Sequence, residues 1–68
     1  MKMSVGTLVL MRINVHMIDG SNVCIGDIGI IVQNELIEEE HYFTNFDYLL
    51  VVNGRDLYVF EDEIEPYA

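Results

Sequence analysis

Three side chains could support nucleophilic or metal chemistry, namely Cys24, His16 and His41. A cysteine and a histidine can act as nucleophile and base even when they are far apart in the sequence. No motif orients these residues, however, and Cys24 lies in an apolar run, where a cysteine is commonly buried and structural. We therefore expect no enzymatic activity, a loop position for His16, and a solvated or capping side chain at His41.

The carboxylates form two clusters that could bind a cation or a basic partner. Ca²⁺ and Mg²⁺ prefer oxygen ligands, but neither cluster has the alternating spacing or the turn glycine of a calcium loop. We expect no metal and no cofactor. A solvated acidic face and a docking surface for Lys and Arg side chains both stay open. The candidate partner-binding carboxylates are Glu38, Glu39, Glu40, Glu61, Asp62 and Glu63, with Glu65 close to the second cluster.

Length and charge narrow the class of protein. The 68 residues predict a single domain, 1–68, and a chain of this size buries only about 60% of its unfolded surface. Twelve acidic residues against three basic ones give a net charge of −9. Three cations neutralise few phosphates, so nucleic acid and anionic membranes are disfavoured. The charge suits a basic protein partner, or serves solubility.

Cysteine usage and hydropathy predict the environment of the chain. A single cysteine excludes an internal disulfide framework. The sequence contains no run of about 18 apolar residues that would predict a transmembrane helix. The segment 1–12 is interrupted by Gly6, Thr7 and Arg12 and is followed by no small-residue cleavage site. We therefore expect a first strand here, in a soluble intracellular protein.

The strongest structural signal is a hairpin over residues 46–60. Two apolar runs, 46–53 and 56–60, meet at Asn53-Gly54, a pair that accepts the positive φ of a two-residue hairpin loop. Other short β segments and turns surround it, without a credible helix of ten residues. Together they predict an all-β barrel or a two-sheet sandwich. The expected elements are a strand at 5–13, a loop folded back onto the body at 14–22, a β segment at 23–34 with a bend at Gly26 and Gly29, a loop or one helical turn at 35–45, a turn at 61–64 and an edge strand at 65–68.

Several of these strands are apolar on both faces, whereas a small barrel needs only one apolar face. Alternate residues of a strand point to opposite sides. The surplus could lie under the 14–22 loop or under Tyr42 and Phe43, or it could form an interface. We favour an interface, with Leu8, Leu10, Leu49 and Val51 as the candidate residues. The opposed sets are Val5, Val9 and Met11 against Leu8 and Leu10; Ile28, Ile30 and Val32 against Ile31; and Tyr48, Leu50 and Val52 against Leu49 and Val51.

Segments at set intervals carry a family resemblance over most of the chain. They are 5–9 (VGTLV), 26–32 (GDIGIIV), 48–52 (YLLVV), 53–54 (NG) and 64–66 (IEP). This spacing resembles small SH3-like barrels, in particular the short uncharacterised proteins of that type in tailed phages. The resemblance implies a five-stranded SH3-like barrel with a short 3-10 turn near the C-terminus. Gly26-x-x-Gly29 is also similar to the KOW-type loop of nucleic-acid-binding factors, although the nearby charges here are acidic.

Two functions from different classes follow as expectations. The first is a non-enzymatic protein–protein interaction module, a phage structural or assembly protein such as a capsid decoration or a head–tail accessory. The alternative is an acidic, DNA-mimic-like inhibitor of a basic host protein that handles nucleic acid. Either role implies a protein partner, self or other, with a homo-oligomer left open, and a location in the virion or in the cytoplasm of an infected cell. A KOW-like nucleic-acid binder is a weaker third option.

Overall fold

The computed structural model describes residues 2–35, 37–39 and 44–67 and confirms the all-β class. Within these ranges the one helical element is the short 3-10 turn expected near the C-terminus. The elements in chain order are β1 (Leu8–Met11), β2 (Val15–His16), β3 (Asn22–Val23), β4 (Ile28–Gln33), β5 (Ile37–Glu39), β6 (Thr44–Phe46), β7 (Tyr48–Val52), β8 (Arg55–Val59), η1 (Glu61–Glu63) and β9 (Ile64–Pro66).

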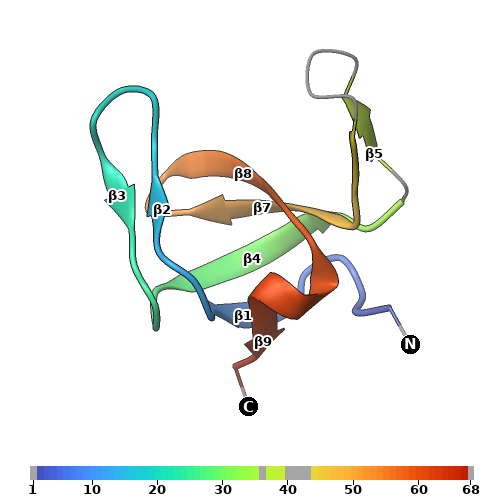
Figure 1. The fold of residues 1–68 in the computed structure, drawn as a ribbon. Helices are drawn as coiled ribbons and strands as arrows, with labels where there is room; N and C mark the ends of the chain where they lie inside the picture. The colour runs from blue at the N-terminus through green and yellow to red at the C-terminus, as the bar shows by residue number, and fades with distance from the viewer. Residues whose placement is uncertain (1, 36, 40–43, 68) are drawn as a thin grey trace.

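Five strands form one antiparallel sheet in the order β8-β7-β4-β1-β9. Two short hairpins, β2–β3 and β5–β6, extend from it on opposite sides (Figure 1). In the part of the chain that the structure describes, β8 and β9 do not pair with each other, so the sheet is curved but open. The closed five-stranded barrel expected from the sequence therefore remains a prediction.

The hairpin at Asn53-Gly54 is confirmed and is tied to a second turn. Both residues have positive φ, 53° and 74°, and the register runs from Tyr48↔Val59 to Val52↔Arg55. Asn53 Nδ2 donates to Asp27 Oδ2 at 2.9 Å, and the same oxygen accepts the Cys24 N–H at 2.8 Å. Asp27 thus joins the turn before β4 to the turn between β7 and β8.

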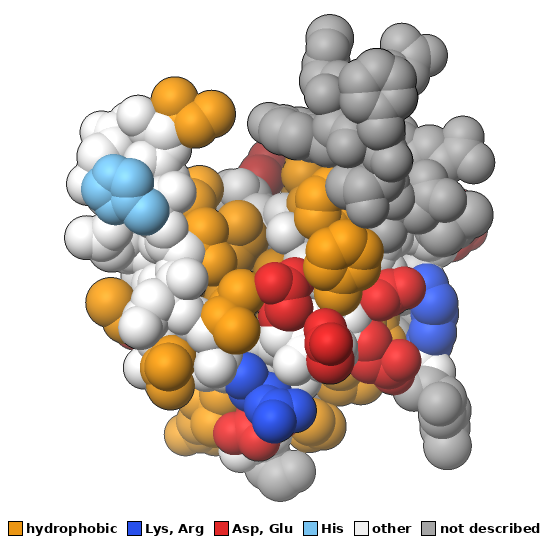
Figure 2. All heavy atoms as spheres, viewed as in Figure 1, with side chains coloured by type: hydrophobic (Ala, Val, Ile, Leu, Met, Phe, Trp, Pro, Cys, Tyr) orange, Lys and Arg blue, Asp and Glu red, His pale blue; other side chains and the backbone are white. Residues whose placement is uncertain are grey.

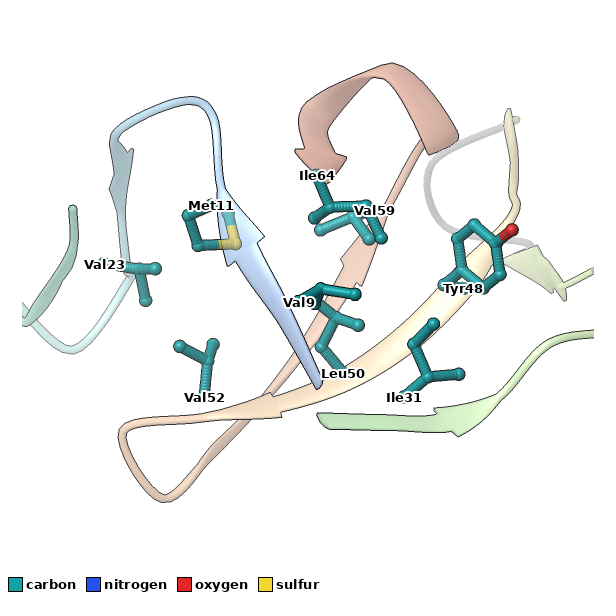
Figure 3. Packing of buried hydrophobic residues seen from close by; sticks show 9 residues of the cluster. All are labelled: Val9, Met11, Val23, Ile31, Tyr48, Leu50, Val52, Val59 and Ile64. Atoms are coloured by element: carbon teal, nitrogen blue, oxygen red, sulfur yellow. The ribbon is translucent and has the colours of Figure 1, made fainter. Parts of the chain in front are cut away.

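The structure settles which strand faces build the core (Figure 3). The core residues come from the five strands of the sheet and from β3, and they meet inside the curve of the sheet, with Val23 of β3 at one end. Tyr48 is fully buried, and its hydroxyl accepts the N–H of Met3 at 3.0 Å. Every buried hydrophobic side chain that the structure describes belongs to one cluster: Val9, Met11, Val23, Ile31, Tyr48, Leu50, Val52, Val59 and Ile64.

The glycine pair before β4 behaves as expected. Gly26 has a φ of 91° in the turn, a conformation that costs glycine little. Gly29 lies where backbones approach closely, because a Cβ placed there would be 3.3 Å from the Val51 carbonyl oxygen and from the Val52 Cβ. The two glycines therefore allow the chain to turn into β4 and then to pack flat against β7.

Two local expectations were wrong in the N-terminal third of the chain. Val5 does not share the inner face with Val9; it lies in a turn before β1 and is 58% exposed. The segment 14–22 is not a plain loop, because Val15 pairs with Val23 in a short hairpin, and Ile18 at its tip is fully exposed.

The polar segment 35–45 contains two strands rather than a helical turn. Pairing in β5–β6 sets Glu38 opposite Asn45 and Glu39 opposite Thr44. No like charge stands directly across from either glutamate in this register, and like charges directly opposite are what destabilises a strand pair. Repulsion between consecutive glutamates therefore did not predict the backbone conformation of this segment. Glu40, His41, Tyr42 and Phe43 lie outside the described residues.

Candidate functional site

The outer side of the three central strands is largely apolar, although a register shift in β4 sets the polar Gln33 opposite Leu49. Cross-strand partners in an antiparallel sheet share a face, and the register aligns Leu8 with Ile30 and Ile30 with Val51. Leu8 is 46% exposed and Ile30 is 37% exposed. We call this surface the outer apolar face. It consists of Leu8 and Leu10 of β1, Ile28, Ile30 and Val32 of β4, and Leu49 and Val51 of β7.

The structure brings together the four apolar residues proposed from the sequence, Leu8, Leu10, Leu49 and Val51. Leu10, Leu49 and Val51 are half-buried, and Leu8 is exposed. Between them lie three β4 residues that were not among the candidates, including Ile28 at 46% and Val32 at 41% exposure. Their alternation with a buried Ile31 was visible in the sequence, but only the pairing of β4 between β1 and β7 places them at the centre of this face.

Carboxylates flank the outer apolar face on both edge strands. Asp56 of β8 pairs with Val51, and Glu65 of β9 pairs with Leu10, so both stand on the same side as the apolar residues. Both are exposed. Of the cations, Arg55 forms an ion pair with Asp19, and Lys2 Nζ donates to the Asn34 carbonyl at 2.7 Å. The face is therefore apolar in the middle and acidic at its two edges.

A groove runs along the free edge of β8. It has a volume of about 330 Å³ and lies between β8 and the tip of the β2–β3 hairpin, where Figure 2 shows hydrophobic side chains in a hollow of the surface. The Phe46 ring stacks on Tyr58 and on Phe60, with centroid distances of 5.6 and 5.0 Å. The lining residues are His16, Met17, Ile18, Phe46, Asp56, Leu57 and Tyr58.

The predicted acidic residues separate into structural and free carboxylates. Glu63 Oε1 accepts the Phe60 N–H at 2.8 Å, and Asp47 Oδ2 accepts the Glu61 N–H at 2.8 Å. These bonds satisfy backbone groups at the start of η1. Glu61 and Asp62 are exposed in η1, and Figure 2 shows several acidic side chains close together on the face that it draws. Of the other cluster, Glu38 and Glu39 lie in β5, and Glu40 lies outside the described residues.

The titratable side chains with shifted pKa values hold turns together. Hydrogen bonds from the Ser21 hydroxyl and N–H, followed by the attraction of Arg55, lower the pKa of Asp19 below its ordinary value. The Cys24 N–H, and then the Asn53 amide, lower the pKa of Asp27. Hydrogen bonds to the charged form have this effect on any carboxylate. Both carboxylates therefore stabilise turns of the chain.

The residues considered for catalysis are not placed as the sequence suggested. Cys24 is exposed rather than buried, because it begins the turn that Gly26 and Asp27 close, outside the strands that face the core. His16 lies in β2 rather than in a loop, and its Nδ1 is 2.7 Å from Asn22 Oδ1. His41 lies outside the described residues.

Searches for other kinds of site and for relatives gave negative results. Within residues 2–35, 37–39 and 44–67, no group of three or more His, Cys, Asp or Glu side chains could hold a metal ion. Over the same ranges, no helix is long and apolar enough to cross a membrane. Comparisons with protein-family models, with curated proteins and with solved structures found no match to this chain.

Proposed function

We propose that this protein is a non-enzymatic protein–protein interaction module with an SH3-like barrel architecture, which docks on a partner through the outer apolar face. The observation that carries the proposal is the set of seven apolar side chains on the solvent side of the central strands. A contiguous exposed apolar surface rimmed by polar residues is typical of an interaction site. The face is built on paired strands of one sheet.

The charge of the chain defines the chemistry of the partner. Asp56 and Glu65 flank the face, and the net charge is −9. A second copy would bring two such charges together, which opposes self-association. The fitting partner is a different protein that offers an apolar patch bordered by Lys and Arg. Steering by opposite charges would then speed the encounter, and burial of the apolar residues would supply most of the affinity.

The proposal includes that this protein is a component of a larger protein assembly. A small β module that is apolar on both sides of its sheet is suited to a permanent contact. One side of the sheet forms the core of the module, and neighbouring proteins of the assembly would cover the other side. This supports a structural or assembly role of the capsid-decoration or head–tail accessory kind. Mass spectrometry of purified virions against infected-cell lysate tests that role, and absence from the particles would contradict it.

A photo-crosslinking residue at position 30 tests the docking face directly. We expect crosslinks to a basic-flanked apolar segment of another protein, and none from the same residue placed at position 25, in the turn before β4. With the purified partner, Ile30→Ser should weaken binding about 3- to 6-fold, because burial of a whole isoleucine is worth about 1.5–3 kcal/mol and docking can bury only the 37% of Ile30 that is exposed.

The control for that titration is Ile25→Ser, which makes the same chemical change in the turn before β4, where Ile25 is 61% exposed and belongs neither to the outer apolar face nor to the groove along β8. It should leave the affinity unchanged. Crosslinks from position 30 to a second copy of the chain would contradict the proposed partner. Equal losses for the two variants would contradict the proposed face.

A second candidate function, a DNA-mimic-like inhibitor of a basic host protein, is favoured by the free carboxylates of Glu61 and Asp62. In this case the acidic surface at η1 binds, and the apolar face does not. The double variant Glu61→Lys with Asp62→Lys separates the two functions. It should abolish binding of an inhibited basic protein, whereas docking through the outer apolar face should survive it.

A further inference from the structure

The edge of β8 offers unpaired backbone groups to the groove. A type I′ turn bonds its first and fourth residues, here Val52 and Arg55. Hydrogen-bonded and non-hydrogen-bonded pairs alternate along an antiparallel ladder, so Leu57 exchanges bonds with Leu50. The N–H and C=O of Asp56 and Tyr58 therefore point away from β7. Within the part of the chain that the structure describes, no hydrogen bond to another element reaches these groups.

The walls of the groove suit an extended chain lying against this edge. Leu57 faces the inner side, toward Met17 of the hairpin, and Tyr58 faces the outer side, where it stacks with Phe46. Exposed sheet edges usually carry protection against pairing, such as lysine, proline, a bulge or a covering loop. The β8 segment, RDLYV, has no proline, and its one cation, Arg55, is held by Asp19. Asp56 is the charge that remains on the edge.

We propose that β8 binds an extended peptide segment of a partner protein as an added sixth strand of the sheet. This is the strand-addition mode of peptide recognition, in which main-chain bonds give affinity and alternate side chains give specificity. The peptide residue opposite Leu57 is apolar and packs into the groove beside Met17. The residue next to Asp56 is Lys or Arg. The site borders the outer apolar face, which Asp56 also flanks, but it uses none of the seven residues of that face.

Selection from a random nonapeptide display library on the full chain, with no partner assumed, tests this proposal. We expect selected peptides to share an apolar residue next to a basic one, and to contain no proline in the paired stretch. Added to ¹⁵N-labelled protein, a synthetic copy should slow hydrogen exchange at the Asp56 and Tyr58 amides at least about tenfold, as formation of strand hydrogen bonds requires.

Two variants at one position isolate the backbone contribution. Asp56→Pro and Asp56→Ala both remove the carboxylate, but only proline removes the outward N–H, and an edge strand tolerates proline when its N–H faces solvent. Asp56→Pro should bind the selected peptide at least about tenfold more weakly than Asp56→Ala. The thermal midpoint of each variant checks that it is folded; if Asp56→Pro does not fold, a synthetic chain N-methylated at Tyr58 makes the same comparison with wild type.

Four results would overturn the proposal. One is a library that yields no binder. Another is a proline-rich consensus that leaves the Asp56 and Tyr58 amides unprotected. A third is equal affinity for Asp56→Pro and Asp56→Ala. The last is protection of the two amides that rises with protein concentration in the absence of peptide, because a second copy would then be the occupant of the edge.

Discussion

Ile30 and Ile31 are neighbours on β4 with opposite environments, and their truncation tests the placement of the core. Ile31 is fully buried, whereas Ile30 is 37% exposed on the outer apolar face. Alanine at either position removes three carbon atoms from the same strand. Differences in β propensity therefore largely cancel, and the contrast between Ile31→Ala and Ile30→Ala reports the burial of each side chain.

The magnitudes follow from the two environments. Three buried methylene-sized groups are worth about 2.4 kcal/mol in transfer free energy. At Ile31 a cavity is added, so we expect a loss of about 3–4 kcal/mol in the free energy of unfolding. At Ile30 solvent fills the space and about a third of the side chain is already wet, so the loss is about 1.5 kcal/mol. A domain of this size has only about 3–10 kcal/mol in total, so Ile31→Ala removes a large share.

Urea unfolding followed by circular dichroism measures both variants, because the chain has no tryptophan. With a slope near 1 kcal/mol per molar urea, the midpoint should fall by about 3–4 M for Ile31→Ala and by about 1.5 M for Ile30→Ala. Equal losses in the isolated monomer would refute the assigned register, because Ile30 would then be as deeply buried as Ile31. A monomer mass for both variants by light scattering is the control for an oligomer that covers Ile30.

Three further predictions concern the turns and the close strand contact. Asn53→Ala should lower the free energy of unfolding by about 1–2 kcal/mol, since alanine resists positive φ and loses the bond to Asp27; Asn53→Gly should lose less, and equal urea midpoints would contradict this. Acid titration of Asp27→Asn should show a weaker loss of stability than wild type as the pH falls through the lowered Asp27 pKa. On acidification the unfolded state protonates Asp27 at a higher pH than the folded state does. The ionised Asp27 carboxylate therefore contributes its full share of the free energy of unfolding only above the ordinary aspartate pKa of about 3.9. Parallel curves of stability against pH for the two proteins would contradict this. Gly29→Ala should lower the thermal midpoint, because its Cβ would meet the Val51 carbonyl at 3.3 Å, and an unchanged midpoint would show that β4 and β7 can separate.

The features that the sequence predicted well are those governed by local rules. Asn53-Gly54 specifies a turn because few residues accept its dihedral angles, and η1 and the all-β class follow from similarly local patterns. Placement of Val5 failed because Gly6, with a φ of 93°, turns the chain before β1 begins, so the alternation of the strand does not extend back to it. The prediction that Cys24 is buried was wrong for the same reason, because Gly26 turns the chain before β4 begins.

The candidate surfaces were only partly predictable because they depend on neighbours that are distant in the sequence. Leu8 and Val51 were identified as surplus apolar residues, but only the register shows Ile30 between them. The groove along β8 combines Met17 with Leu57 and Tyr58, which are about 40 positions apart, and no local pattern reports that contact. Strand β8 has a free edge because it is the last strand in the order of the sheet, and this order is set by pairing between segments that are distant in the sequence.

The hairpin and the outer apolar face are linked through register. Asn53-Gly54 fixes β7 against β8, and β7 in turn pairs with β4. A slip of one residue moves every side chain to the other face. It would bring Val51 into the core and put Leu50 outside, and it would remove Asp27 from the reach of Asn53. The bond between Asp27 and Asn53 therefore does more than stabilise two turns, because it favours the register that offers Ile30 and Val51 to a partner. The double change Asn53→Pro with Gly54→Val should for this reason abolish folding and binding together, whereas Ile30→Ser should weaken binding and leave the chain folded.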